Sequence, residues 1–121
     1  MLENTFYLPF PPTINSYYSH TRNGVYISKK GRLFRESILD AVNQQKGDYF
    51  TTLSKPLQVD IILQMPDRRV RDLDNYMKAL LDAVTKAEVW TDDSIIDKLT
   101  VTRGEIIKKG HVTMTITPFE Q

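Results

Sequence analysis

The sequence contains no cysteine. This absence excludes disulfide bonds, zinc sites with thiolate ligands and a cysteine nucleophile. No apolar run approaches the roughly 20 residues that a membrane-spanning helix needs. The first ten residues, MLENTFYLPF, lack a basic start followed by an apolar stretch, so we expect no signal peptide and a cytoplasmic protein without membrane contact.

The composition is that of a small folded domain. The chain has 121 residues, of which 40% are hydrophobic and 26% charged. This length predicts one domain, residues 1–121. A domain of this size has a modest stability margin, so pairing with a second copy is one way to cover apolar surface.

The net charge of +1 hides an asymmetry between the two halves of the chain. Residues 1–71 hold ten Lys/Arg and six Asp/Glu, a balance of +4, whereas residues 72–121 hold six and nine, a balance of −3. A basic half suits contact with phosphates, and an acidic half suits cation binding.

Hydrophobic periodicity predicts strands and helices in the order β-α-β-α-β-β. Strands are predicted at 5–10, 57–65, 99–101 and 112–116, and helices at 32–46 and from about 74 to 87. Residues 13–31 are predicted to form a loop with a turn at Asn23-Gly24. Its tyrosines could stack on nucleic-acid bases or pack against the protein, and the pattern leaves both open. The loop carries Tyr17, Tyr18, Tyr26, Arg22, Lys29 and Lys30.

Two aspartates precede the second helix. Asp72 and Asp74 are two residues apart, so in extended backbone their carboxylates project to the same side. Mg²⁺ prefers oxygen ligands, usually one or two carboxylates with water and substrate phosphate. A third acid could come from Asp92 or Asp93, after the helix. That helix is about 20 Å long, so the following loop would have to double back.

Basic residues flank these aspartates. Lys78 lies one helical turn after Asp74, where it could offset phosphate charge in a transition state or stabilise a metal-activated hydroxide. Arg68, Arg69 and Arg71 lie just upstream, and guanidinium groups bind phosphate oxygens bidentately. Carboxylates flanked by arginines suggest phosphodiester hydrolysis.

Each of these features also has a purely structural interpretation. Asp72 or Asp74 could serve only as a helix N-cap. Asp74 and Lys78 could form a surface ion pair worth a few tenths of a kcal/mol. Asp92 and Asp93 could lie in a solvated turn. From spacing alone these alternatives remain open.

Three stretches together resemble the RusA-type Holliday junction resolvases, which are small endodeoxyribonucleases of bacteria and prophages. They are LPFPPTINSYYSH near the start, MPDRRVRDLDNYMKALLDAVTKAEVWTDD in the middle and TMTIT near the end. The resemblance implies an α+β fold with a mixed sheet and two main helices, a homodimer with a basic face, and two active sites. Paired sites would suit the two-fold symmetry of a four-way junction. Two departures are Val70, which interrupts an arginine run, and Glu88, where a small residue is common.

The resemblance also implies roles for individual residues. Mg²⁺ would be bound by Asp72, Asp74 and Asp93, and Asp93 would fold back to the start of the helix. Beside this resemblance, we expect Asp92 to assist in binding the metal and Mn²⁺ to serve as a substitute. Lys78 matches the essential lysine of the family. The residues expected to contact DNA are Arg68, Arg69, Arg71, Asn75, Lys29 and Lys30.

The expected function is therefore magnesium-dependent cleavage of branched DNA in recombination and repair, in the cytoplasm of a bacterium and encoded by the cell or a phage. Activated water would attack the phosphate and leave a 5′-phosphate and a 3′-hydroxyl. Two alternatives remain: a branched-DNA binding protein without significant nuclease activity, and a small phosphoryl-transfer enzyme or phosphatase with the same metal site.

Overall fold

A computed structural model describes residues 3–120, and its order of main elements confirms the expected one. The elements are β1 (Asn4–Leu8), α1 (Ile14–Tyr17), β2 (Tyr18–Thr21), β3 (Gly24–Ile27), α2 (Lys29–Gln45), β4 (Leu57–Gln64), the 3₁₀ turn η1 (Leu73–Tyr76), α3 (Met77–Lys86), the 3₁₀ turn η2 (Asp93–Ile95), β5 (Ile96–Arg103) and β6 (His111–Pro118). Within residues 3–120, no helix is long and apolar enough to cross a bilayer.

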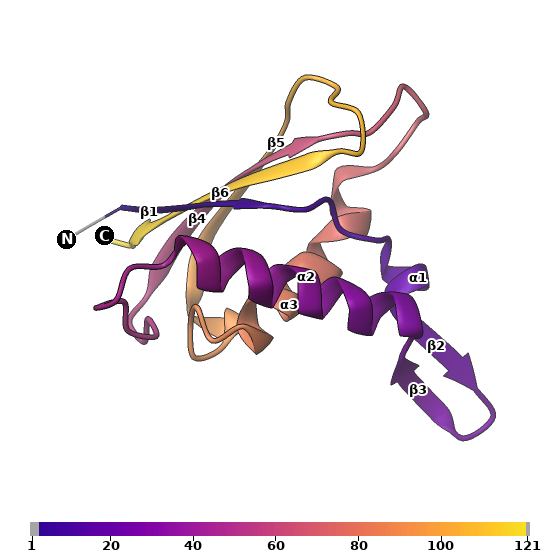
Figure 1. Ribbon diagram of the computed structural model, residues 1–121, viewed down its shortest axis with the longest axis horizontal. Helices are drawn as coiled ribbons and strands as arrows, with labels where there is room; N and C mark the ends of the chain where they lie inside the picture. Colours follow the sequence, from indigo (N-terminus) through magenta and orange to yellow (C-terminus); the bar gives the residue numbers. More distant parts are fainter. Residues whose placement is uncertain (1–2, 121) are drawn as a thin grey trace.

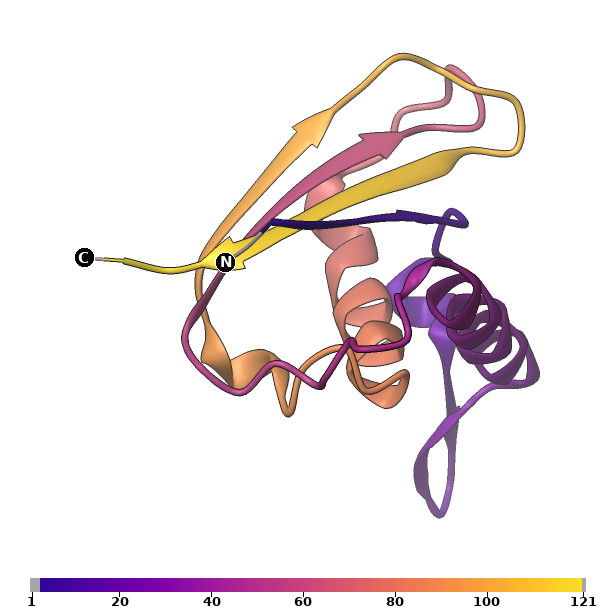
Figure 2. The ribbon, with the colours of Figure 1, turned by 60° about the vertical axis from the view of Figure 1, so that its left-hand side comes forward.

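The molecule has two layers. Strands β1, β6, β4 and β5 form one sheet in that order, and α2 and α3 cover one of its faces (Figures 1 and 2). Strand β4 pairs with β5 in parallel and with β6 antiparallel, and β1 pairs antiparallel with β6. The α+β class and the mixed sheet are therefore confirmed.

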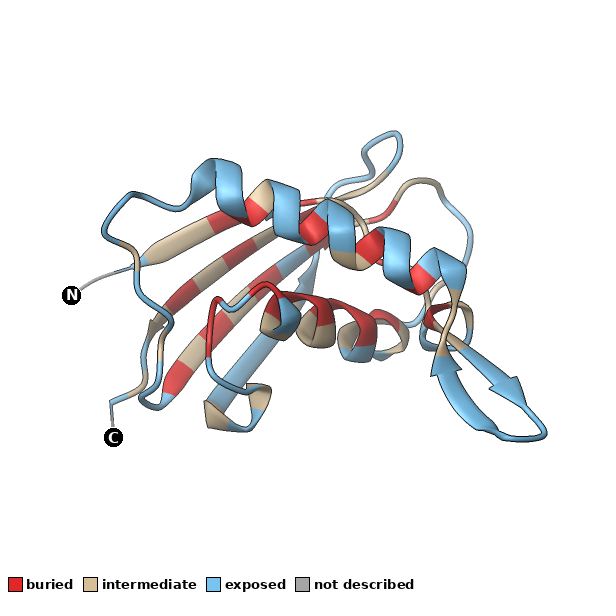
Figure 3. Ribbon diagram, turned by 60° about the horizontal axis from the view of Figure 1, so that its bottom comes forward, coloured by how far each residue is buried: buried red, intermediate tan, exposed pale blue. Residues whose placement is uncertain are grey.

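The core lies between the sheet and the two helices. In β4, alternate residues Leu57, Val59, Ile61 and Leu63 are buried, which gives the strand its striped appearance in Figure 3. Each such side chain contributes about 1.5–3 kcal/mol by leaving water. Helix α2 buries Phe34, Ile38 and Val42, spaced four residues apart.

Helix α2 differs from its prediction at its start. It begins at Lys29, three residues earlier than expected, because the Ser28 hydroxyl accepts a hydrogen bond from the Gly31 N–H (2.9 Å) and caps the helix. The apolar residues in the sequence of this helix also include Leu33 and Leu39, which are 53% and 43% exposed. The buried stripe is one residue wide per turn and excludes them.

The predicted loop at 13–31 is wrong over most of its length. It forms the short helix α1 and a hairpin of β2 and β3, which pair from Tyr18↔Ile27 to Thr21↔Gly24. The turn was correctly placed at Asn23-Gly24, where Gly24 adopts a φ of +132° that suits glycine. The strands escaped prediction because every residue from 19 to 26 is exposed, so no alternation of apolar residues marks them (Figure 3).

The parallel pair β4–β5 decides where the candidate residues lie. Its two strands end at the same edge of the sheet, where the Arg103 guanidinium donates to the Arg71 carbonyl (2.7 Å) and η1 begins shortly afterwards. Turn η2 precedes β5 and therefore lies at the opposite edge. Helix α3 begins directly after η1 and runs back toward η2, which packs beside it.

Candidate active site

Asp72 and Asp74 lie at the start of η1. Asp72 occupies the N-cap position with extended backbone (φ −86°, ψ 134°), yet its side chain makes no capping hydrogen bond. Both residues are exposed. Among residues 3–120 the ion pairs use Asp67 and Asp82 as their acids, not Asp74. Both carboxylates therefore remain available, which does not fit a purely structural role.

Lys78 follows in the first turn of α3 and is exposed. It forms no ion pair with Asp74 within the part of the chain that the structure describes. Its ammonium group instead lies near enough to Asp92 to contribute to the lowered pKa of that carboxyl group. Lys78 is therefore free to meet a phosphate.

Asp92 and Asp93 have different environments. The Asp92 carboxylate accepts a hydrogen bond from the Ser94 N–H (3.0 Å) and caps η2. Hydrogen bonds from Ser94 are also the main reason that the pKa of Asp92 lies below its usual value. Asp93 is half-buried and begins η2. The turn interpretation thus holds for Asp92.

The structure does not gather the three expected ligands in one chain. Turn η2 packs beside α3 (Figure 2), so the loop after the helix does double back. However, residues 3–120 contain no group of three His, Cys, Asp or Glu side chains able to hold a metal ion. That Asp93 completes the site with Asp72 and Asp74 therefore stays a prediction.

The arginines expected to contact DNA differ in accessibility. Arg71 is only 16% exposed and donates to both carboxylate oxygens of Asp67 (3.0 and 2.9 Å) and to the Tyr76 hydroxyl (3.2 Å). These hydrogen bonds, first the one with Tyr76, raise the pKa of Arg71. Arg69 is 78% exposed and only loosely paired with Asp67 (3.3 Å), and Arg68 is also exposed. Arg71 therefore braces the loop, while Arg68 and Arg69 face solvent.

A hollow of about 290 Å³ adjoins Asp72. Asn75, which the motif singled out, is half-buried in its wall. Thr13 and Tyr76 also line it, and neither was predicted to belong to the site. Tyr76 directly follows Asn75 in the sequence, whereas Thr13 reaches the hollow only through the fold. Lys29 and Lys30 are exposed at the start of α2 and do not line it. The full lining is Thr13, Arg69, Val70, Arg71, Asp72, Asn75 and Tyr76.

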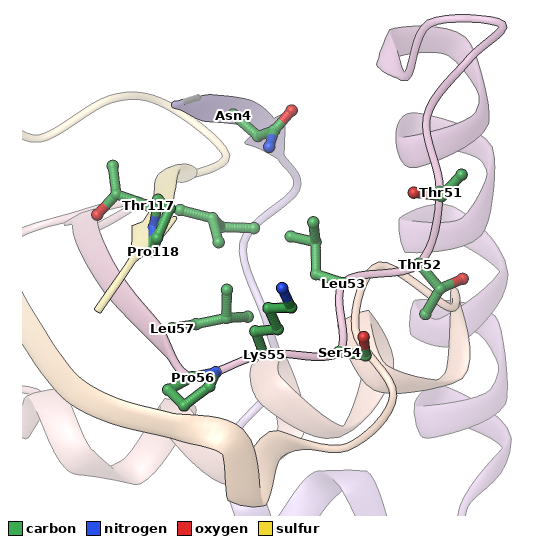
Figure 4. A pocket seen from close by; sticks show the side chains of 11 residues that line it. Asn4, Thr51, Thr52, Leu53, Ser54, Lys55, Pro56, Leu57, Thr117 and Pro118 are labelled. Atoms are coloured by element: carbon green, nitrogen blue, oxygen red, sulfur yellow. The ribbon is translucent and has the colours of Figure 1, made fainter. Parts of the chain in front are cut away.

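A larger hollow, of about 390 Å³, lies where residues 51–57 meet the ends of β1 and β6 (Figure 4). Lys55 is the one charged side chain among its lining residues, which are otherwise polar or apolar without acid or imidazole groups. It therefore offers neither carboxylate or imidazole ligands for a metal nor a general base. The hollow beside Asp72 remains the candidate active site.

Comparison with known proteins decides the family. The family model described as Endodeoxyribonuclease RusA matches residues 9–117. This chain belongs to the RusA family. Relatives named crossover junction endodeoxyribonuclease RusA are 39% identical in Enterobacteria phage 82 (116 residues, 94% of this chain and 95% of the relative) and 39% identical in Shigella sonnei (110 residues, 91% and 90%). The relative of that name in Escherichia coli is 38% identical over 110 residues (91% and 90%). RusA membership makes the chain an endodeoxyribonuclease and implies a divalent metal cofactor.

Proposed function

We propose that this RusA-family protein is a magnesium-dependent resolvase, with Mn²⁺ as a substitute, that cuts four-way junctions by paired symmetrical nicks during recombination and repair. Its place would be the bacterial cytoplasm, whether encoded by the cell or a phage. The observation that carries the proposal is the pair Asp72 and Asp74, whose carboxylates the fold leaves unused in a chain of nuclease ancestry. The names of the relatives support the junction as substrate.

The donor set at the start of η1 fits a hard divalent cation. Two aspartate side chains, exposed and two residues apart, supply the one or two carboxylates that Mg²⁺ usually takes from a protein, with water and phosphate completing its shell. When bound, the cation neutralises charge on the scissile phosphate and makes water a better nucleophile.

The protein's own side chains would hold and polarise the substrate. Lys78 offsets the negative charge that develops on the phosphate, since its ammonium group is not used in an ion pair among residues 3–120. Arg68 and Arg69 contact neighbouring phosphates, and Asn75 lines the hollow beside them. Arg71 acts through the loop, because its hydrogen bonds to Asp67 and Tyr76 fix the backbone that leads to Asp72.

Asp93 requires a second copy of the chain in this proposal. Within one chain it begins η2, and residues 3–120 contain no group of three acidic or histidine side chains able to hold a metal ion. A homodimer with two-fold symmetry can place η2 of one copy beside η1 of the other, and the same operation then builds two equal sites. Each site would use Asp72 and Asp74 from one copy and Asp93 from its partner.

One assay tests the function. Purified protein is incubated with a labelled four-way junction, a linear duplex or a phosphomonoester, in Mg²⁺ or in chelator. Symmetrical nicks in the junction that require the metal are expected. Junction binding without nicks under every condition would instead indicate a DNA-binding protein, and phosphate release from the monoester would indicate a phosphatase; either result contradicts the proposal.

A further inference from the structure

The β2–β3 hairpin projects from the body of the molecule (Figure 1). All its residues from 19 to 26 are exposed, and the side-chain hydrogen bonds of its tip are internal, such as Tyr26 to the Asn23 carbonyl (3.1 Å). A two-stranded hairpin is at best marginally stable alone. Only its base, Tyr18 and Ile27, packs against the core, so the order of its exposed tip suits contact with another molecule.

The charge around the hairpin indicates the chemistry of that molecule. From residue 4 to residue 35 the sequence has no Asp or Glu, but five Lys/Arg. Arg22 lies at the hairpin tip, and Lys29, Lys30 and Arg32 lie exposed in the first turn of α2 at its base. A basic projection without acids complements a polyanion such as DNA.

One face of the hairpin presents an isolated aromatic ring. Cross-strand pairing puts Ser19 opposite Tyr26 and Thr21 opposite Gly24, and alternation along the strands places all four on one side. Tyr26 is 53% exposed and is the only large side chain on that face. Its small neighbours leave the ring open to a sugar or a base.

The base of the hairpin is fixed to the helical layer. The Tyr17 hydroxyl donates to Asp82 on α3 and accepts from Arg35 Nε on α2 (2.7 Å). Burial is the main reason that the pKa of Tyr17 is raised, which keeps this hydroxyl a donor. Directly after β3, the Ser28 hydroxyl donates to the Ser16 carbonyl (2.6 Å). The base of the hairpin is therefore held against α2 and α3, the helix that carries Lys78.

We propose that the β2–β3 hairpin is a DNA-binding arm, with Arg22 and the basic first turn of α2 on the phosphates and the Tyr26 ring against a sugar or base of a duplex flanking the cut. This inference rests on the proposed function.

Thr13, which lines the hollow at Asp72, immediately precedes α1 and the hairpin. Strand β2 has four residues, so the hairpin is about 13 Å long. This length is shorter than one turn of a DNA duplex, about 34 Å. A two-stranded ribbon also fits the major groove.

Binding in chelator, where nothing is cut, tests the arm. The affinity of the full-length protein for a labelled four-way junction and a linear duplex is measured by fluorescence anisotropy over a range of salt concentrations. Tyr26→Ala should weaken binding by about ten-fold and Tyr26→Phe should retain it, since the ring supplies the contact. Arg22→Gln should lower the slope of log K against log salt by about 0.9, the loss of one phosphate contact.

Matched controls come from the other end of α2. Tyr49 is 97% exposed and Lys46 follows the helix, so Tyr49→Ala and Lys46→Gln should bind like the unaltered protein. Thermal melting confirms that each variant folds. If Tyr26→Ala binds as tightly as Tyr49→Ala, or changes only the oligomeric state, the arm is not a DNA contact. Metal-dependent cleavage by the unaltered protein is scored separately, so failure of the resolvase proposal leaves the binding result readable.

Discussion

The molecule has two pairs of aspartates at the starts of two 3₁₀ turns, and the pairs behave differently. At η2, Asp92 caps the turn through the Ser94 N–H. At η1, Asp72 occupies the same N-cap position without a capping bond. Asp92 is thus partly explained by local structure, whereas Asp72 and Asp74 are not. A carboxylate without a capping bond or an ion pair among residues 3–120 is the better candidate for a ligand.

The largest expected effect comes from the pair at η1. Asp74→Asn removes one charge without changing shape, so cleavage of a four-way junction in Mg²⁺ should fall on the order of 10²–10³-fold, the size typical of losing one electrostatic group at a reacting centre. Junction affinity in chelator should change little. Asp40→Asn, on the exposed face of α2, is the matched control and should cut normally. Normal cleavage by Asp74→Asn would show that η1 is not part of the active site.

A mixing experiment tests whether the pairs at η1 and η2 meet across two chains. Asp74→Asn and Asp93→Asn should each be inactive alone. When they are mixed and allowed to exchange subunits, half of the dimers become hybrid and each hybrid has one intact composite site, so nicking should recover to about a quarter of normal. Sites built within one chain predict no recovery. The measurement is the nicking rate against the mixing ratio.

The sequence predicted the framework better than the site. The alternation in 57–65 and the four-residue spacing of Phe34, Ile38 and Val42 predicted β4 and α2, because one face of each is buried. The hairpin has no buried face and was therefore missed, although its turn was placed at Asn23-Gly24.

The candidate site was predictable only where its residues are close in the sequence. Asp72, Asp74 and Lys78 follow one another at one edge of the sheet. The position of Asp93 depends on the parallel pairing of β4 with β5, a long-range property that local spacing does not contain. Thr13 likewise reaches the hollow at Asp72 only through the fold.

A smaller effect on cleavage is expected at Asp92. It distinguishes capping of η2 from metal binding by the two aspartates there. Asparagine is as good an N-cap as aspartate, so Asp92→Asn should keep η2 intact and cut junctions within about three-fold of the normal rate, unlike Asp93→Asn. A loss as deep as that of Asp93→Asn, with unchanged melting temperature, would show that Asp92 assists with the metal, as predicted from the sequence. The two variants are compared side by side for cleavage rate and thermal melting.

The smallest expected effect is at Glu88, where the loop that carries Asp92 and Asp93 leaves α3. Glu88 follows the C-cap Ala87 with a φ of +63°, a left-handed conformation that favours glycine at a helix end. Its side chain is exposed, so Glu88→Gly should relieve strain without losing packing and raise the melting temperature by about 2–4 °C. Glu36→Gly, inside α2, should lower it, since glycine costs about 1 kcal/mol in a helix interior. Cleavage by Glu88→Gly should stay normal, because glycine prefers the backbone conformation that this position already has. A fall in cleavage would mean that the Glu88 carboxylate itself contributes to the site beside Asp92 and Asp93.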